Sequence, residues 1–437
     1  MTRSLKTLEQ VGAILFRDRS LVVSLILVVA SFSYLFLVNR YDFSIKETNV
    51  SLVEAQSILS GEITLPQRLH DTALYKERVV NIFQPGQTIF FLAHLMAAGG
   101  NRGVGIFQVE LFLVFVLSVF LFSLALFRLS NGQAIFSMSL AASLLFGAPY
   151  IANLPVALNG SVYRVNNVLS ILFVAALLVF VSSKNLDQKL PLIGACIGAA
   201  MLFRTQNALL FFLPLSLILQ DAEGRAWQIS EAFSTPAARL ALASQVTKLF
   251  VFPLLAGIII AGFQVARFQN PFETGYAYIY VGRTDYLAQR ASEYGLFSLH
   301  FLPENLYRTF FAFPIFEIDG WRIAKIIGDP RGNSLLFSQP ILLIIFFLRE
   351  SPVTARAKSF LFVSLLLAVP VWLYHNPGIT APGYMRLSLD YLPLWIATIA
   401  VFASYVPRSR YILWASVIAA IWAILYGIIL LTMKVAV

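Results

Sequence analysis

The sequence has 437 residues, of which 58% are hydrophobic and 12% charged. An ordinary soluble domain carries about 25% charged residues, so this composition excludes a chain whose surface faces water throughout. The net charge is +10 at pH 7, but Lys and Arg concentrate in short segments between apolar runs, as the orientation rule for membrane proteins predicts. We therefore expect a multi-pass integral membrane protein with the bilayer as its main partner and no nucleic acid.

Apolar runs long enough to cross a bilayer recur along the chain. A spanning helix needs about 20 apolar residues to cross about 30 Å of hydrocarbon, and a helix satisfies its own backbone groups in lipid. The sequence predicts an all-α polytopic protein with about eleven transmembrane helices, near residues 21–38, 104–127, 134–150, 165–181, 190–203, 206–220, 247–266, 335–348, 359–374, 389–405 and 411–433.

The basic residues set the expected orientation. With the N-terminus in the cytoplasm, the predicted cytoplasmic loops are all basic, from Arg128 to Arg410, because Lys and Arg are retained on that side. The short outside loops hold only Arg164, Arg204 and Arg386, which the orientation rule does not explain. Ionisable residues at membrane depth are functional candidates by default.

We expect two long segments on the outer side, and we call residues 39–103 the first excursion and residues 267–334 the second excursion. Apolar residues of 50–59 recur at helical spacing, which predicts an amphipathic helix on the membrane surface. A short apolar stretch after the turn at Pro85 predicts a juxtamembrane helix. No repeat or linker divides the chain, so we expect one membrane domain over residues 1–437.

Acidic residues of the first excursion are candidates for acid and base chemistry. Asp42 follows the first predicted helix at the outer surface, where a carboxylate can deprotonate a hydroxyl group. The alternative is a solvated loop acid that pairs with Arg40 or Lys46. Asp71 and Glu77 are further candidates, although acids in mixed-charge loops are more often simply solvated.

The second excursion opens with a run from Asn270 to Tyr276 that contains Glu273. Its many tyrosines could offer ring faces to sugars or form an interfacial belt, and the belt accounts for most of them. The single cysteine, Cys196, excludes an intrachain disulfide and a multi-cysteine metal site. The four histidines are scattered and show no metal-ligand spacing.

The last outside loop carries Tyr384, Arg386 and Asp390. Arg386 and Asp390 are four residues apart and could form an ion pair on one helix face. Arg204 and Arg164 lie on the same predicted side, and together these arginines could hold a phosphate group.

Taken in order, these features resemble the GT-C superfamily, the polytopic glycosyltransferases that use polyprenyl-phosphate sugar donors. The most similar members are bacterial and related to protein mannosyltransferases and aminoarabinose transferases. The resemblance covers nearly the whole chain and rests on the acid after the first helix, on the proline turn before the juxtamembrane helix, and on three motifs. These motifs are Phe203-Arg204-Thr205-Gln206-Asn207, Asn270-Pro271-Phe272-Glu273-Thr274-Gly275-Tyr276, and Gly383-Tyr384-Met385-Arg386 through Asp390-Tyr391-Leu392-Pro393.

The resemblance implies transfer of a sugar, with inversion, from a polyprenyl-phosphate donor to a hydroxyl group of a glycan, lipid or protein acceptor. It places the reaction on the extracytoplasmic face of a bacterial inner or plasma membrane, with Asp42 as the base. The family's usual Asp-Glu pair is Asp42-Phe43 here, which leaves open whether Asp42 acts alone, acts with Glu47, or is replaced as the base by Asp71. The residues implied in substrate and phosphate binding are Arg164, Arg204, Glu273, Tyr276, Tyr384, Arg386 and Asp390.

The sequence does not identify a cofactor. No glycine-rich nucleotide loop is present, so no nucleotide is expected, and a divalent metal is left open. Two other functions compete with sugar transfer by a polyprenyl-phosphate-dependent enzyme. One is a transporter or flippase of an anionic lipid-linked substrate, and the other is a polysaccharide polymerase or ligase.

Overall fold

The structure is a computed structural model of the chain. It describes residues 49–69, 72–97, 104–151, 153–158, 160–183, 185–221, 226–280, 283–319, 322–327, 334–348, 354–376, 386–405 and 410–432. The predicted first helix lies outside these ranges, and so do three predicted site residues, Asp42, Asp71 and Tyr384.

Most of the described residues are helical. By length and composition, seven helical segments among them could cross a membrane, so the prediction of a multi-pass helical membrane protein is confirmed; the count of eleven and the orientation stay predictions. These segments are α5 (Val104–Leu129), α6 (Ala134–Phe146) with α7 (Ala148–Ile151), α9 (Val162–Val181), α10 (Leu186–Phe203), α13 (Pro236–Phe268), α18 (Ala355–Leu373) and α20 (Arg410–Thr432).

Three predicted crossings are irregular instead of continuous α-helices. Each combines an α-helix with a 3₁₀ helix, which rises about 2.0 Å per residue and so covers more depth with fewer residues. Pro340 and Pro393 stand at two junctions, where the missing N–H interrupts an α-helix. The pairs are η2 (Thr205–Phe211) with α11 (Phe212–Ile218), α17 (Leu335–Ser338) with η4 (Pro340–Leu348), and η5 (Arg386–Asp390) with α19 (Leu392–Ala403).

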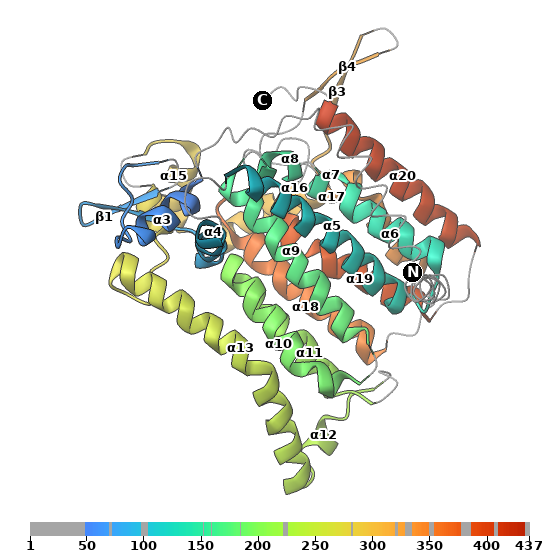
Figure 1. Cartoon of the computed structure of the whole chain (residues 1–437). Coiled ribbons are helices and arrows are strands. Elements are labelled where there is room, and N and C mark those ends of the chain that lie inside the picture. The colour runs from blue at the N-terminus through green and yellow to red at the C-terminus, as the bar shows by residue number, and fades with distance from the viewer. Residues whose placement is uncertain are drawn as a thin grey trace, which may run out of the picture.

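The long helices pack side by side in one bundle (Figure 1), with α9 between α5 and α10, and α10 against α13. Gly194 and Gly198 allow the last of these contacts. A Cβ atom at these positions would lie 2.4 Å from the carbonyl oxygen of Leu249 and 2.7 Å from that of Phe252. Two glycines one turn apart therefore bring the backbones of α10 and α13 together, as small residues do in membrane bundles.

The two excursions form short elements outside the bundle, including two β-hairpins that sequence patterns did not indicate. The first excursion forms α3 (Val50–Leu59), β1 (Thr72–Tyr75), β2 (Arg78–Asn81) and α4 (Pro85–Ala97). The second forms α14 (Tyr276–Ile279), α15 (Tyr286–Tyr294), η3 (Leu299–Phe301), α16 (Leu302–Phe310), β3 (Ile315–Asp319) and β4 (Arg322–Ile327). Two short helices, α8 (Asn153–Leu158) and α12 (Ile229–Ala232), complete the described elements.

The predicted helix at 50–59 is present as α3, but one of its faces is buried within the protein. Val50, Ser51, Glu54 and Ala55 lie on that face, and α3 packs against α4. The predicted juxtamembrane helix is present as α4 and begins at Pro85.

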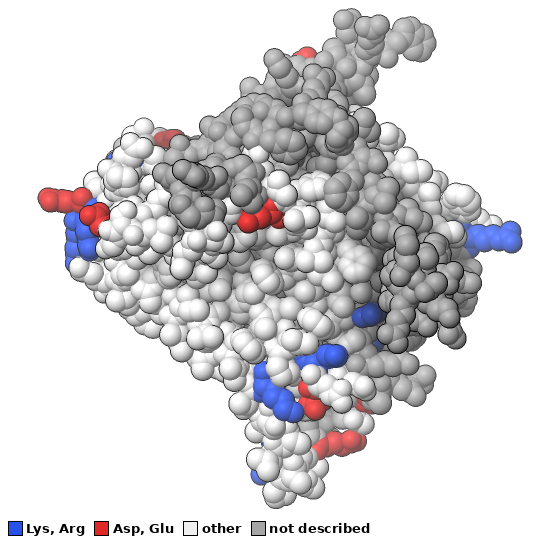
Figure 2. Space-filling model, in the orientation of Figure 1, with Lys and Arg blue, Asp and Glu red and all other residues white. Residues whose placement is uncertain are grey.

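The excursions gather at one end of the bundle. Figure 1 shows α3, α4, β1 and α15 together at the end where α13 finishes, whereas α12 lies at the other end. Among the described residues drawn in Figure 2, Lys and Arg gather near these ends, and the band between is almost free of charged side chains. An uncharged band between two polar ends is the surface that a bilayer requires.

Candidate functional site

An ion pair forms where α10 ends. The Nη2 atom of Arg204 lies 2.5 Å from the Oδ2 atom of Asp390, and the Nη1 atom of Arg204 donates to Oδ1 of Asn167 at 2.9 Å. The side chain of Arg204 is 19% exposed and that of Asp390 is 4% exposed. Two partners therefore fix the guanidinium group in one orientation, while part of it stays accessible.

The break after α10 produces this geometry. Arg204 adopts an extended conformation, with φ −147° and ψ 104°, and the 3₁₀ helix η2 begins at the next residue. The side chain of Asn207 donates to Ser170 Oγ at 2.8 Å and to the backbone oxygen of Ala200 at 3.1 Å. Asn207 thus holds the break against α9, and the Phe203–Asn207 motif acts as a unit that turns Arg204 out of the helix.

The predicted ion pair between Arg386 and Asp390 is wrong, because Asp390 pairs with Arg204 instead. Residues 386–390 form a 3₁₀ helix, which has about three residues per turn, so positions four apart do not lie on one face. The guanidinium carbon of Arg386 lies 5.0 Å from the ring centroid of Tyr163. Arg386 is buried, and its Nε atom has no hydrogen-bond partner among the described residues.

Arg386 is nevertheless close to the ion pair. The charges of Arg386 and Arg204 both interact electrostatically with the carboxylate of Asp390 and with the phenol of Tyr374. The phenol of Tyr374 also interacts with those of Tyr276 and Tyr280. The structure therefore brings Arg204, Arg386 and Asp390 into one cluster, which we call the arginine cluster, beside tyrosines of the second excursion.

Arg164 has a different partner from the arginine cluster. Its Nη1 atom donates to Oδ1 of Asn153, and the amide of Asn153 donates to the backbone oxygen of Pro149. Arg164 is buried and joins α9 to α8. This predicted phosphate ligand thus lies at the same end of α9 but contributes to packing.

Glu273 also makes a local contact. Its Oε1 atom accepts a hydrogen bond from the backbone N–H of Gly275 at 2.8 Å. Gly275 has φ +77°, and a Cβ atom there would lie 2.3 Å from the ring of Phe268, so only glycine fits this turn. The turn starts α14 and brings Tyr276 against the apolar cluster that includes Phe268 and Ile279.

A second ion pair, which sequence patterns did not indicate, joins the two excursions. Glu54 of α3 and Arg267 at the end of α13 are both completely buried. The Nε atom of Arg267 donates to Oε1 of Glu54 at 2.7 Å, and its Nη1 atom donates to the backbone oxygen of Phe83 at 2.6 Å. The only signals in the sequence are an acid on the apolar side of an expected amphipathic helix and a base at the end of an apolar run.

Two further side chains complete this network. Oε2 of Glu54 accepts from Asn81 Nδ2 at 2.8 Å, from Thr88 Oγ1 at 2.5 Å and from Arg267 Nη2. The network joins α3, β2, α4 and α13, so the first excursion is attached to the helix that leads into the second.

The turn at Pro85 and Gly86 brings α4 beside Arg204. A Cβ atom on Gly86 would lie 2.6 Å from the backbone oxygen of Leu202, so α4 touches the last turn of α10 through bare backbone. Phe83, just before this turn, packs edge-to-face on Tyr163 at 4.8 Å between ring centroids. Since Arg386 lies over the same tyrosine, the first excursion borders the arginine cluster on two sides.

Contacts of the second excursion hold His375, which follows α18. Arg290 forms an ion pair with Glu304, and its Nε atom donates to the backbone oxygen of His375 at 2.8 Å. The hydroxyl oxygen of Tyr280 lies 2.7 Å from Nε2 of His375. Burial lowers the pKa of His375 to about 4, so this imidazole is neutral at physiological pH.

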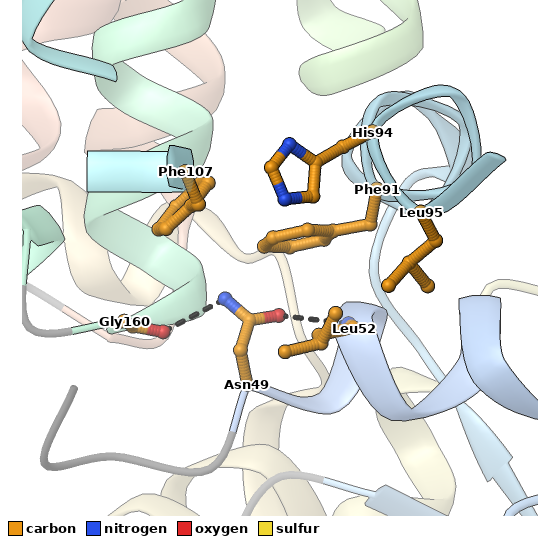
Figure 3. Close-up of a pocket in the computed structure, with 7 residues that line it drawn as sticks. All are labelled: Asn49, Leu52, Phe91, His94, Leu95, Phe107 and Gly160. Atoms are coloured by element: carbon orange, nitrogen blue, oxygen red, sulfur yellow. Dashed lines mark hydrogen bonds between the residues drawn. The ribbon is translucent and has the colours of Figure 1, made fainter. Parts of the chain in front are cut away.

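The pocket between α3, α4 and α5 is too small for a sugar. Figure 3 shows Phe91, Phe107 and His94 around it, with Asn49 bonded to the backbone of Gly160 and Leu52. Its volume is about 10 Å³, about that of one water probe. The Nδ1 atom of His94 lies 2.8 Å from Oε2 of Glu110, a contact that joins α4 to α5.

Within the described ranges, no group of three or more His, Cys, Asp or Glu side chains could hold a metal ion. No family model, no curated protein and no solved structure matches the chain. The arginine cluster and the excursions around it are therefore the basis for a function.

Proposed function

We propose that the protein is a glycosyltransferase that moves a sugar from a polyprenyl-phosphate donor to an acceptor hydroxyl on the extracytoplasmic face of a bacterial membrane. The arginine cluster is the observation that carries this proposal. Two guanidinium groups and one carboxylate have a net charge of +1, which suits one bound phosphate group. Arginine donors arranged in advance stabilise the charge that develops on a departing phosphate.

The reaction is a single displacement. The acceptor oxygen attacks the anomeric carbon, the bond from that carbon to the phosphate oxygen breaks, and the phosphate leaves with the electron pair. A carboxylate takes the proton of the acceptor hydroxyl. We assign this step to Asp42, with Asp71 as the alternative, from their positions in the sequence and the resemblance to the GT-C superfamily.

Each member of the arginine cluster has a distinct part in this proposal. Arg204, oriented by Asp390 and Asn167, faces the leaving phosphate without rearrangement. Arg386 supplies the second charge, and its Nε atom, which has no hydrogen-bond partner among the described residues, is available as a donor. Tyr276, Tyr384 and Glu273 belong to the sugar side of the site, where tyrosine rings can cover apolar faces of a sugar.

The test uses membranes from a deletion strain, analysed for a missing sugar residue and an accumulated lipid-linked precursor. Wild-type protein is expected to restore transfer, and Asp42→Asn to abolish it while donor binding and folding are retained. Full activity of Asp42→Asn together with inactive Asp71→Asn would move the base to Asp71. Movement of the intact lipid-linked sugar across the membrane, with no new glycosidic bond, would replace the proposal with a flippase.

A further inference from the structure

A polar cavity lies at the opposite end of the bundle from the arginine cluster. It has a volume of about 610 Å³ and is lined by the ends of α5, α9 and α19 and by the start of α18. Asn167 and Ser182 lie near the two ends of α9, fifteen residues apart, which corresponds to about 22 Å along a helix. The cavity is therefore separate from the site proposed for sugar transfer.

The lining of this cavity is basic and rich in hydrogen-bonding groups. Its described residues are Arg128, Leu129, Asn131, Ser182, Ser183, Arg356, Val401, Ser404 and Tyr405. Among the described residues, this lining contains two arginines and no carboxylate, and neither arginine has a carboxylate partner. Two neighbouring cationic groups without a counter-charge attract an anion.

Only some of the N–H donors of Arg356 have acceptors at the end of a helix. Its Nη2 atom donates to the backbone oxygen of Val181 at 3.3 Å, a favourable contact for a cation at the C-terminal end of a helix. Its Nε atom is buried and has no hydrogen-bond partner among the described residues. An unpaired buried donor costs free energy, and an anion in the cavity would satisfy it.

We propose that this cavity binds a phosphate ester, with Arg356 and Arg128 as its charged ligands and Ser182, Ser183 or Ser404 as hydroxyl donors. Its place at the end of the bundle, at the level of the basic loops, matches the depth of phospholipid headgroups. A lipid headgroup and a soluble phosphate present the same oxygen atoms to these donors. The experiment separates the two sources.

The full-length protein, purified in a neutral detergent, is titrated with phosphatidylglycerol, with phosphatidylcholine and with inorganic phosphate, and bound ligands are counted by native mass spectrometry. Each arginine is expected to contribute about tenfold in dissociation constant, as hydrogen bonds to charged groups usually do. Arg356→Gln and Arg128→Gln should each weaken the binding of phosphatidylglycerol by that factor and have little effect on the binding of phosphatidylcholine. Arg410→Gln is the matched control, because Arg410 is exposed at the start of α20 and does not line the cavity.

Arg128 is exposed, so its variant tests the inference even if Arg356→Gln folds poorly. Arginine-dependent binding of phosphatidylglycerol identifies a lipid headgroup site. Arginine-dependent binding of inorganic phosphate without phosphatidylglycerol identifies a site for a soluble phosphate ester. Binding that is equal in wild type and both variants, or no selective binding at all, overturns the proposal and leaves these arginines as helix-end ligands only.

Discussion

Two ion pairs among the described residues, Arg267–Glu54 and Arg204–Asp390, differ in how many hydrogen-bond donors of the arginine have acceptors. Arg267 and Glu54 are fully buried, and Nε, Nη1 and Nη2 of Arg267 all have acceptors. Arg204 is partly exposed, and its Nε atom has no partner among the described residues. An arginine whose donor nitrogens all have acceptors stabilises the fold. An arginine with a fixed orientation and a donor without an acceptor can bind a ligand. The difference separates two residues that look alike in the sequence.

The largest expected effect is a loss of folding stability when one charge of the Glu54–Arg267 pair is removed. Glu54→Gln leaves Arg267 buried without a counter-charge, which costs about 3–5 kcal/mol in comparable pairs. We expect a large fall in melting temperature in detergent, or loss of the folded protein. Asp187→Asn is the control, because Asp187 pairs with Lys248 at 3.6 Å at the surface, where such pairs contribute about 1 kcal/mol or less. Equal melting of both variants would contradict the structural role of Glu54.

The second prediction concerns the activity of the arginine cluster. Arg204→Gln and Arg386→Gln should each lower the turnover number for sugar transfer by about 10²–10³, the usual effect of losing one donor to a developing negative charge. The measurement is transfer of labelled sugar in reconstituted vesicles, with melting temperature recorded for each variant. Arg164→Gln is the comparison, and it should lower stability more than turnover, since Arg164 binds Asn153. The reverse pattern would exchange the roles of these arginines.

A smaller effect is expected at the contact between α4 and α10. Gly86→Ala would bring a Cβ atom to 2.6 Å from the backbone oxygen of Leu202, so α4 must move away from Arg204. Overpacking of this kind costs about 1–3 kcal/mol, and we expect a lower melting temperature and lower transfer activity. Gly257→Ala is the matched control, because a Cβ atom there meets nothing within 4 Å. Unchanged activity in Gly86→Ala would separate this contact from the site.

The smallest effect is a pH dependence of the second excursion. The pKa of His375 is lowered to about 4 by burial, from an ordinary value of 6.5. The unfolded chain therefore binds a proton more readily than the folded chain. The contribution of neutral His375 to stability is complete above pH 6.5 and is lost as the pH falls towards 4. Hydrogen exchange at pH 7 and pH 5 should show faster opening around Tyr280 at the lower pH, and His375→Gln should remove the difference. A difference that persists in this variant would assign it to another group.

Glu304 adds to the same trend at lower pH. Burial by itself would raise the pKa of this carboxyl group, but hydrogen bonds and the charges of Arg290 and Arg308 outweigh burial and hold the pKa below its ordinary value of 4.5. The contribution of ionised Glu304 to stability is present above pH 4.5 and is lost as the pH falls below that value. Both groups therefore make the second excursion less stable in acid.

Most of the bundle follows from hydropathy, because a run of about 20 apolar residues has few alternatives to a spanning helix. The predicted ends of α5 and α20 agree with the structure to within two residues. The 3₁₀ segments were missed, since 3₁₀ and α-helices have similar apolar composition. The neighbourhood of Arg204, Arg386 and Asp390 was indicated by their shared side of the membrane. Their pairing depends on the backbone form of residues 386–390, which composition does not reveal.

The contact between Glu54 and Arg267 could not be predicted from the sequence. The two residues are 213 positions apart, and each resembles an ordinary charged residue at a helix end. The fold of the first excursion around Glu54 depends on long-range burial, and hydrophobic periodicity does not encode partners. The same holds for the close approach of Gly86 to Leu202.

The length of α13 has a consequence for the depth of the protein in the bilayer. Its 33 residues measure about 50 Å at 1.5 Å per residue, whereas the hydrocarbon layer is about 30 Å thick. One end is anchored, because Arg267 is bound to Glu54 and Phe83. The surplus must emerge at the Thr235 end or be absorbed by tilt. In a bilayer of different thickness, α13 would change its tilt while its end at Arg267 stays in place. The tilt of α13 therefore sets the distance between the arginine cluster and the opposite membrane surface.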